Sequence, residues 1–112
     1  MKKINYLQTK TAKTIKKFIN NHVNEHSNFK IVYSRWYVGV TNNPTNRKNA
    51  HKNTNQKEPY FWVHFNCRSK NIALAIEQFY HDKGMLETDH QGGTANDTYY
   101  VYVYKKHKTI LD

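Results

Sequence analysis

Cysteine is almost missing from this sequence, since Cys67 is the single one. One thiol excludes an intramolecular disulfide and the zinc sites built from several cysteines, so we expect Cys67 to be a buried side chain without a chemical role. Proline and glycine are also scarce, at 2 and 4 residues, and neither a low-complexity linker nor an internal repeat is present. A chain of 112 residues with this composition predicts one domain with a modest core.

Long apolar runs are missing as well. No stretch of the sequence reaches the roughly 20 apolar residues that cross a bilayer, and the N-terminus has no apolar segment typical of a signal peptide. We therefore expect no membrane partner and, by default, a cytoplasmic protein.

Acidic residues are few, at 8 Asp and Glu against 18 Lys and Arg, which leaves a net charge of +10 at pH 7. Such an excess predicts attraction to polyanions, with nucleic acid as the first choice and an anionic membrane as the second. The alternative is a solvated surface on a Lys- and Asn-rich chain from an AT-rich genome. Aromatic residues, by contrast, make up 14% of the chain, which predicts a small core rich in rings.

Helical patterns occupy three parts of the sequence. Residues 3–23 place apolar side chains on one helical face and lysines on the other; we expect this helix to dock on a sheet, the alternative being a basic membrane-binding or calmodulin-type helix. Residues 41–43 offer capping side chains before Pro44, which suits the first position of a helix. A further helix is expected from its cap at Ser69 to a stop at Gly84.

Strand patterns also occupy three places. Residues 36–40 are aromatic and β-branched, residues 60–65 alternate aromatic with other side chains, and residues 98–104 form the clearest strand pattern. Residues 29–33 are expected to be a short strand or an extended lead, and residues 86–97 a loop. The sequence therefore predicts an α/β (α+β) fold, with a small three-stranded mixed or antiparallel sheet flanked by about three helices.

The stretch WYVGVTNNPTNRKNAH, residues 36–51, is the most informative part of the chain. Gly39 interrupts the strand, which indicates a bulge or a backbone that another group must approach closely. Arg47 and His51 stand four residues apart and so share one face of the predicted helix. A strand tyrosine, Tyr37, thus leads across a tight turn to a helix that presents a guanidinium and an imidazole.

Three segments carry a resemblance to the GIY-YIG nuclease superfamily: the stretch 36–51, AIEQFYHDKGM at 75–85 and TYYVYVY at 98–104. The chain more closely resembles a group of small uncharacterised proteins with a motif like WYVGxTNxPxxRxxxH. The YIG motif of the superfamily corresponds to YVG at 37–39. The likeness covers roughly residues 36–104, and its joint spacing is fairly specific. It implies one GIY-YIG-like domain over 1–112, in which 1–28 is an N-terminal helical extension and 29–106 is the core.

The resemblance implies a role for each matched residue in hydrolysis of a phosphodiester. Tyr37 is expected to be the general base for the attacking water, although a tyrosine hydroxyl is a weak base at neutral pH unless nearby positive charge favours the phenolate. Arg47 would bind the phosphate with its planar guanidinium, and His51 would donate a hydrogen bond or a proton near the scissile bond. Glu77 would hold one Mg²⁺ or Mn²⁺.

Two further residues are candidates for the remaining family positions. Tyr33, in IVYSRWYVG, is a possible counterpart of the tyrosine in the first motif, GIY, and Asn96, in GGTAND, is a possible counterpart of a late asparagine. Three lysines are expected to follow a nucleic-acid backbone, namely Lys48, Lys52 and Lys57, and either Trp62 or Tyr60 to stack on a base. His64 alternates with Trp62 and is expected to face the same surface.

Ordinary structural roles compete with each of these assignments. A strand tyrosine such as Tyr37 can be a core residue, Arg47 and His51 can lie on a solvated helix face, Glu77 can pair with a nearby lysine, and Asn96 can simply form a turn.

With the resemblance, the sequence supports a metal-dependent nuclease, with DNA more expected than RNA. The alternative is a non-catalytic module that binds nucleic acid, a nucleotide or another phosphate ligand, as a regulatory or sequestering protein of a mobile element. A homodimer is compatible with either function, and a protein-interaction adaptor has the least support.

Overall fold

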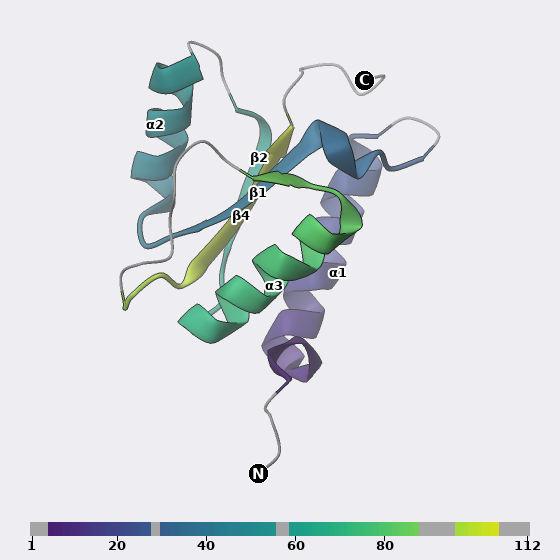
Figure 1. Ribbon diagram of the computed structural model, residues 1–112, viewed down its shortest axis with the longest axis vertical. Helices are drawn as coiled ribbons and strands as arrows, with labels where there is room; N and C mark the ends of the chain where they lie inside the picture. The colour runs from purple at the N-terminus through teal and green to yellow at the C-terminus, as the bar shows by residue number, and fades with distance from the viewer. Residues whose placement is uncertain (1–4, 28–29, 56–58, 88–95, 106–112) are drawn as a thin grey trace.

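The computed structural model describes residues 5–27, 30–55, 59–87 and 96–105, without the side chains of residues 51–55 and 87. From α1 to β3 the longer helices alternate with strands, and β4 follows β3 along the chain (Figure 1). The elements are η1 (Tyr6–Gln8), α1 (Lys10–Glu25), η2 (Tyr33–Arg35), β1 (Trp36–Thr41), α2 (Pro44–Asn55), β2 (Tyr60–Asn66), α3 (Lys70–Lys83), β3 (Leu86–Glu87) and β4 (Tyr100–Lys105), where η marks a short 3-10 helix.

The sheet has the strand order β2-β4-β1-β3. Its three longer strands are antiparallel, with β4 between β2 and β1, so the predicted small α+β fold is confirmed. The two-residue β3 pairs in parallel with β1 through Leu86 opposite Tyr37 and Glu87 opposite Val38. We expected residues 86–97 to be a loop; that prediction was wrong for β3, because a pair of residues is too short to show an alternating pattern.

The faces of the sheet differ in composition because successive side chains of a strand point in opposite directions. One face contributes valines of β1 and β4 to the hydrophobic core. The core also contains buried side chains of α1 and α3. Its strand members are Trp36, Val38, Val40, Val101 and Val103, and its helix members are Ala12, Ile15, Ile19, Val23, Ala73, Ile76 and Tyr80. Cys67 is buried with them, as predicted.

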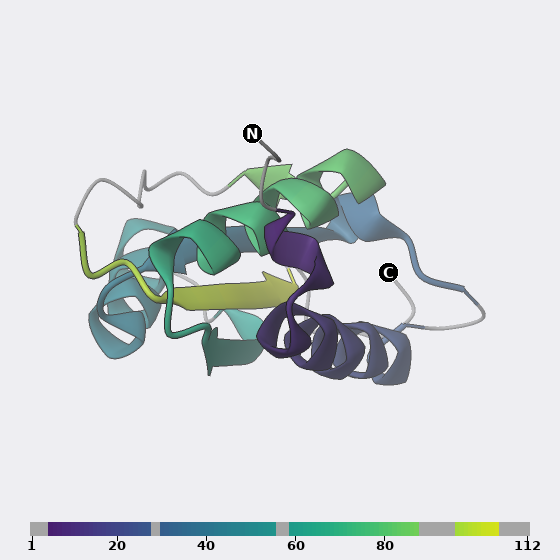
Figure 2. The same ribbon diagram turned by 90° about the horizontal axis from the view of Figure 1, so that it is seen from below.

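The helices form layers on either side of the sheet. Helices α1 and α3 lie side by side against the valine face, whereas α2 lies across the strands from them (Figures 1 and 2). The predicted docking of the N-terminal helix on the sheet is therefore confirmed.

The N-terminal helix is shorter than predicted. Instead of one helix over 3–23, the described chain forms η1, breaks at Thr9 and then forms α1. The break has a local cause, since the Thr9 side chain caps α1 by accepting a hydrogen bond from the Ala12 backbone N–H at 3.2 Å. Residues 30–32 form no strand, and Val32 is extended. Tyr33 already belongs to η2, so the strand expected over 29–33 is absent from the described residues and the extended lead ends at Val32.

Helix α3 is bounded as its sequence predicts and is tied to α1 by a buried tyrosine. Ser69 caps its start, and Gly84 ends it in the left-handed region at φ 116°, where glycine is favoured. Tyr80 is fully buried and donates its hydroxyl toward the Lys16 carbonyl at 3.1 Å and the Asn20 side-chain oxygen at 2.7 Å. Burial raises the pKa of Tyr80, so the neutral hydroxyl joins the helices.

Removing that hydroxyl tests the link between α1 and α3. Tyr80→Phe keeps the ring in the core but leaves the oxygens of Lys16 and Asn20 without their donor, so we expect the free energy of unfolding to fall by about 1 kcal/mol. Chemical denaturation measures the change. The exposed Tyr99, 40% accessible, supplies the control, and an equal loss in Tyr99→Phe contradicts the assignment.

Glycine at position 39 allows a ring to lie across β1. A Cβ atom added to Gly39 would lie 2.4 Å from the Tyr102 hydroxyl oxygen and 2.5 Å from the ring carbon that bears it. Tyr102 is only 1% exposed and stacks on Trp62 at 4.6 Å, so its ring has little room to move away. The close approach predicted at Gly39 is therefore made by Tyr102.

Alanine at position 39 is expected to overpack this face. Gly39→Ala should lower the free energy of unfolding by about 1–3 kcal/mol, because the added methyl group must displace the Tyr102 ring. In a Tyr102→Leu background the same substitution should cost clearly less, and a double-mutant cycle followed by urea denaturation measures the coupling. Equal costs in both backgrounds would show that Tyr102 is not what excludes a side chain at position 39.

Candidate functional site

The turn from β1 to α2 is organised by short polar side chains. The Thr41 hydroxyl oxygen accepts a hydrogen bond from the Asn43 backbone N–H at 3.0 Å, and the Asn43 side-chain oxygen accepts one from the Asn46 N–H at 3.1 Å. Pro44 is the first residue of α2, and the Arg47 N–H closes the first helical turn on the Asn43 carbonyl at 3.0 Å. The predicted helix start at Pro44 is thus confirmed. It fixes the position of the Arg47 backbone relative to the end of β1.

Burial defines which side of α2 faces the sheet. Pro44, Arg47 and Ala50 are half-buried, whereas their neighbours at 45, 46, 48 and 49 are exposed. Their spacing of three residues puts them on one helical face, so we infer that Arg47 lies on the side of α2 turned toward the strands. His51 lies in α2 one turn after Arg47, but its side chain is outside the described part of the structure.

Tyr37 belongs to a row of parallel rings on the face of the sheet opposite the valines. It stacks on Tyr104 with ring centres 5.0 Å apart and planes 10° apart. Tyr104 in turn stacks on Trp62 at 5.7 Å and 19°. Tyr37 and Trp62 are half-buried, whereas Tyr104 is 5% exposed. The row therefore crosses β1, β4 and β2, with its accessible rings at the two ends.

A bulge in β2 directs Trp62 into this row. The register of β2 against β4 shifts between Tyr60 and Val63, and Phe61 within the shift has a positive φ of 56°. Phe61 turns toward α1, where its carbonyl accepts a hydrogen bond from His22 Nε2 at 2.6 Å and its ring stacks on His26 at 4.2 Å. These contacts with α1 offset the strained backbone at Phe61 and leave Trp62 on the opposite face.

His64 lies beside Trp62, on the surface where we expected both. The Trp62 indole N–H donates a hydrogen bond to His64 Nδ1 at 3.0 Å, which requires that nitrogen to be unprotonated. Burial, and to a smaller extent the positive charge of Lys48, lowers the pKa of His64. This repulsion puts the Lys48 ammonium of α2 within electrostatic range of the His64 ring, and we group Trp62, His64 and Lys48 as an aromatic and basic patch.

Glu77 lies on a different helix from these residues. It is half-buried in α3. Phe79 faces α1, since the Lys16 ammonium lies 4.5 Å from its ring centre. At 3.6 residues per turn, Glu77 is about 160° round the helix from Phe79, on the flank of α3 away from α1. Sequence reasoning gave no role to His81, one turn later on that flank, whose buried Nε2 has no hydrogen-bond partner among the described residues.

The other two candidates lie apart from Tyr37. Tyr33 packs against the hydrophobic core, and its Cβ is 3.4 Å from where a Cβ on Gly84 would be. Tyr33 is therefore on the core side of the sheet, whereas the Tyr37 ring is on the other face. Asn96 is exposed in the turn before β4, next to Asp97, whose carboxylate accepts a hydrogen bond from the Asn42 side chain at 3.3 Å.

The candidate nucleic-acid contacts are only partly described. Lys48 is exposed and Trp62 half-buried, the side chain of Lys52 is not described, and Lys57 lies outside the described residues. No three His, Cys, Asp or Glu side chains in the described segments gather into a group that could hold a metal ion. The predicted nucleic-acid and metal residues stay predictions.

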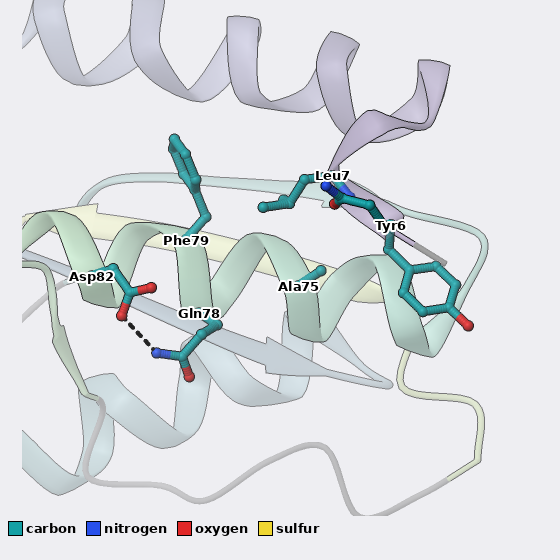
Figure 3. A pocket seen from close by; sticks show the side chains of 7 residues that line it. Tyr6, Leu7, Ala75, Gln78, Phe79 and Asp82 are labelled. Atoms are coloured by element: carbon teal, nitrogen blue, oxygen red, sulfur yellow. Dashed lines mark hydrogen bonds between the residues drawn. The ribbon is translucent and has the colours of Figure 1, made fainter. Parts of the chain in front are cut away.

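A hollow of about 520 Å³ lies between η1 and α3 (Figure 3). Mostly apolar side chains surround it, and Gln78 donates a hydrogen bond to the Asp82 carboxylate at 2.8 Å along its rim. None of the predicted site residues lines this hollow: they lie on the sheet, on α2 and, for Glu77, elsewhere on α3. Its lining consists of Asn5, Tyr6, Leu7, Ala75, Gln78, Phe79 and Asp82.

No family model, curated protein or solved structure matches this chain. The resemblance to the GIY-YIG superfamily therefore rests on the sequence segments already named, which lie in β1, α2, α3 and β4. Among the described helices, none combines the length and apolar character needed to cross a bilayer.

Titration of His64 tests the geometry of the patch. Its pKa should lie below the ordinary 6.5 of histidine, because burial disfavours the charged ring and Lys48 repels it. Lys48→Ala should raise that pKa but leave it below 6.5, since burial is the larger cause. NMR of the histidine ring protons measures both values. A pKa unchanged by Lys48→Ala would contradict the placement of α2 beside β2.

The same shift has a consequence for stability. The folded state favours neutral His64, so the unfolded chain binds more protons near pH 6.5 and acidification through this range should lower the free energy of unfolding. The Trp62 indole should lose its acceptor over the same range, which a shift of its N–H resonance would report.

Proposed function

We propose that this protein is a metal-dependent nuclease of the GIY-YIG type that cleaves phosphodiester bonds in nucleic acid. The observation that carries the proposal is the β1-turn-α2 unit. It holds Tyr37 on the aromatic face of the sheet and begins a helix whose sheet-facing side includes Arg47. A guanidinium and a phenol supplied to one side of the sheet are suited to binding and hydrolysing a phosphodiester.

Stacking gives Tyr37 a fixed orientation. The Tyr104 ring stacks on one face of the Tyr37 ring, with ring centres 5.0 Å apart. This contact holds the plane of the Tyr37 ring and so restricts where its hydroxyl points. In the proposed reaction the phenolate of Tyr37 takes a proton from water, the water oxygen attacks phosphorus, and the bond from phosphorus to the leaving oxygen breaks. Arg47 would bind the phosphate oxygens through paired N–H groups. His51 would supply the proton that the leaving oxygen takes.

Glu77 is suited to a hard divalent cation bound by few protein ligands. A single carboxylate, with water and substrate phosphate as the other ligands, is a common arrangement for Mg²⁺. Strand β3 pairs only with Tyr37 and Val38 of β1, so in the described chain no strand borders β1 from Gly39 onward on the edge opposite β4. The flank of α3 that carries Glu77 is turned away from α1, toward this open edge. When bound there, the cation would offset charge that develops on the phosphate.

A non-catalytic binding module is the second candidate. The predicted catalytic residues are distributed over both sides of the sheet, which favours this module. Tyr33 and the helix that bears Glu77 lie on the valine side, whereas Tyr37 lies on the other. Such a module would keep Arg47 and the basic charge for a phosphate ligand without the metal-dependent step. Cleavage assays separate the two functions.

Metal-dependent cutting is the direct test. The pure protein should cleave labelled DNA or RNA when Mg²⁺ or Mn²⁺ is present and lose that activity with EDTA. Glu77→Gln should reduce cleavage at least 100-fold yet leave binding within about threefold, because it removes a metal ligand and not a phosphate contact. Arg47→Ala should impair both cleavage and binding.

An exposed acid and an exposed base supply matched controls for these variants. Glu25→Gln and Lys17→Ala alter residues on the solvent side of α1 and should leave cleavage within about twofold of wild type. Binding that is lost in Arg47→Ala, with no cutting under any metal condition, would support the binding module. Cleavage by Glu77→Gln at the wild-type rate would remove Glu77 from the metal site.

A further inference from the structure

The patch formed by Trp62, His64 and Lys48 has the composition of a surface that binds bases and phosphates together. Trp62 is half-buried, while His64 and Lys48 are exposed. Tyr100 adds an edge-on contact to the His64 ring at 5.9 Å. An aromatic face next to a lysine ammonium is what recognition of unpaired nucleotides requires, because the base stacks on the ring and the phosphate meets the charge.

The Trp62 ring is held ready for stacking. Tyr102 stacks on it at 4.6 Å with planes 12° apart, and Tyr104 does so at 5.7 Å. The hydrogen bond from its indole N–H to His64 fixes the rotation of the ring. An aromatic ring that is already immobilised loses little conformational entropy when a base stacks on it, so more of the stacking energy appears as affinity.

The position of the patch joins it to the proposed catalytic residues. Trp62 and Tyr37 are the two accessible ends of one row of rings, with Tyr104 between them. Lys48 directly follows Arg47 on α2, so the two charges lie on the same turn of the helix, about 100° apart around its axis. A nucleic-acid strand whose base stacks on Trp62 would therefore lie at one end of the row of rings that ends at Tyr37.

We propose that this patch binds single-stranded nucleic acid and so makes the unpaired strand the substrate class of the site, an inference that rests on the proposed function for its catalytic consequence. The faces of bases in a duplex are covered by their neighbours, so only an unpaired strand can offer one to Trp62. A duplex presents its phosphates to Lys48 and Arg47 but gains nothing from the ring.

Binding of oligonucleotides without metal tests the proposal separately from catalysis. Fluorescence anisotropy with a labelled 20-nucleotide oligo(dT) and with a 20-base-pair duplex, at one fixed salt concentration, gives both dissociation constants. Trp62→Ala should weaken binding to the single strand by about 5- to 100-fold, as expected for the loss of one stacked base, and change binding to the duplex less than twofold. Trp62→Phe should restore most of the affinity.

Phe18→Ala is the matched control, since Phe18 is 53% exposed and also stacked, on Phe65 at 6.0 Å. It should leave both dissociation constants unchanged. An unchanged affinity of Trp62→Ala for oligo(dT), or an equal loss for the duplex, overturns the proposal. Far-ultraviolet circular dichroism and the thermal midpoint show whether each variant is folded. If Trp62→Ala does not fold, Trp62→Leu, which keeps apolar volume but has no aromatic ring, takes its place and should lose the same affinity for the single strand.

Failures of the two proposals are distinguishable. If the protein prefers the single strand, loses that preference in Trp62→Ala and shows no metal-dependent cutting, this inference holds and the nuclease proposal is wrong. Cleavage that is confined to duplex and unaffected by Trp62→Ala supports the nuclease and removes the inference that the substrate is a single strand.

Discussion

The alternation of side chains along β4 is the constraint on which the structure depends. Val101 and Val103 enter the hydrophobic core, and the tyrosines at 100, 102 and 104 point to the opposite face. Because β4 lies between β1 and β2, this one strand sets the character of both faces of the sheet. A shift of its register by one residue would exchange them and bury tyrosines against α1 and α3. The division into a valine face and an aromatic face follows from that register.

Local signals made much of the fold predictable. The caps at Asn43 and Ser69 and the stop at Gly84 act within a few residues, so the sequence indicates where α2 and α3 begin or end. The break at Thr9 and strand β3 were missed. The break at Thr9 is hidden by an apolar periodicity that continues across it and predicts an unbroken helix. Strand β3 depends on where the chain returns to the sheet after α3, which no short sequence pattern encodes.

The candidate site divides in the same way. The relation of Tyr37 to Arg47 follows from a strand, a capped turn and one helical turn, and was open to prediction. The shared surface of Trp62 and His64 followed from strand alternation. The bulge at Phe61, the stack that joins Tyr37 to Trp62 and the approach of Lys48 to His64 are contacts between distant segments. They depend on how three strands and α2 assemble, and so they emerged only from the structure.

The two tryptophans provide the most direct test of the account, because Trp36 belongs to the core face and Trp62 to the other. Each indole N–H gives its own signal in a ¹H–¹⁵N NMR spectrum, and the protein can be titrated with unlabelled oligo(dT) in the absence of metal. We expect the Trp62 signal and the backbone signals of α2 to shift as the oligonucleotide is added, while the Trp36 signal stays in place. Shifts confined to the lysine-bearing surface of α1, with the Trp62 signal unmoved, would contradict it.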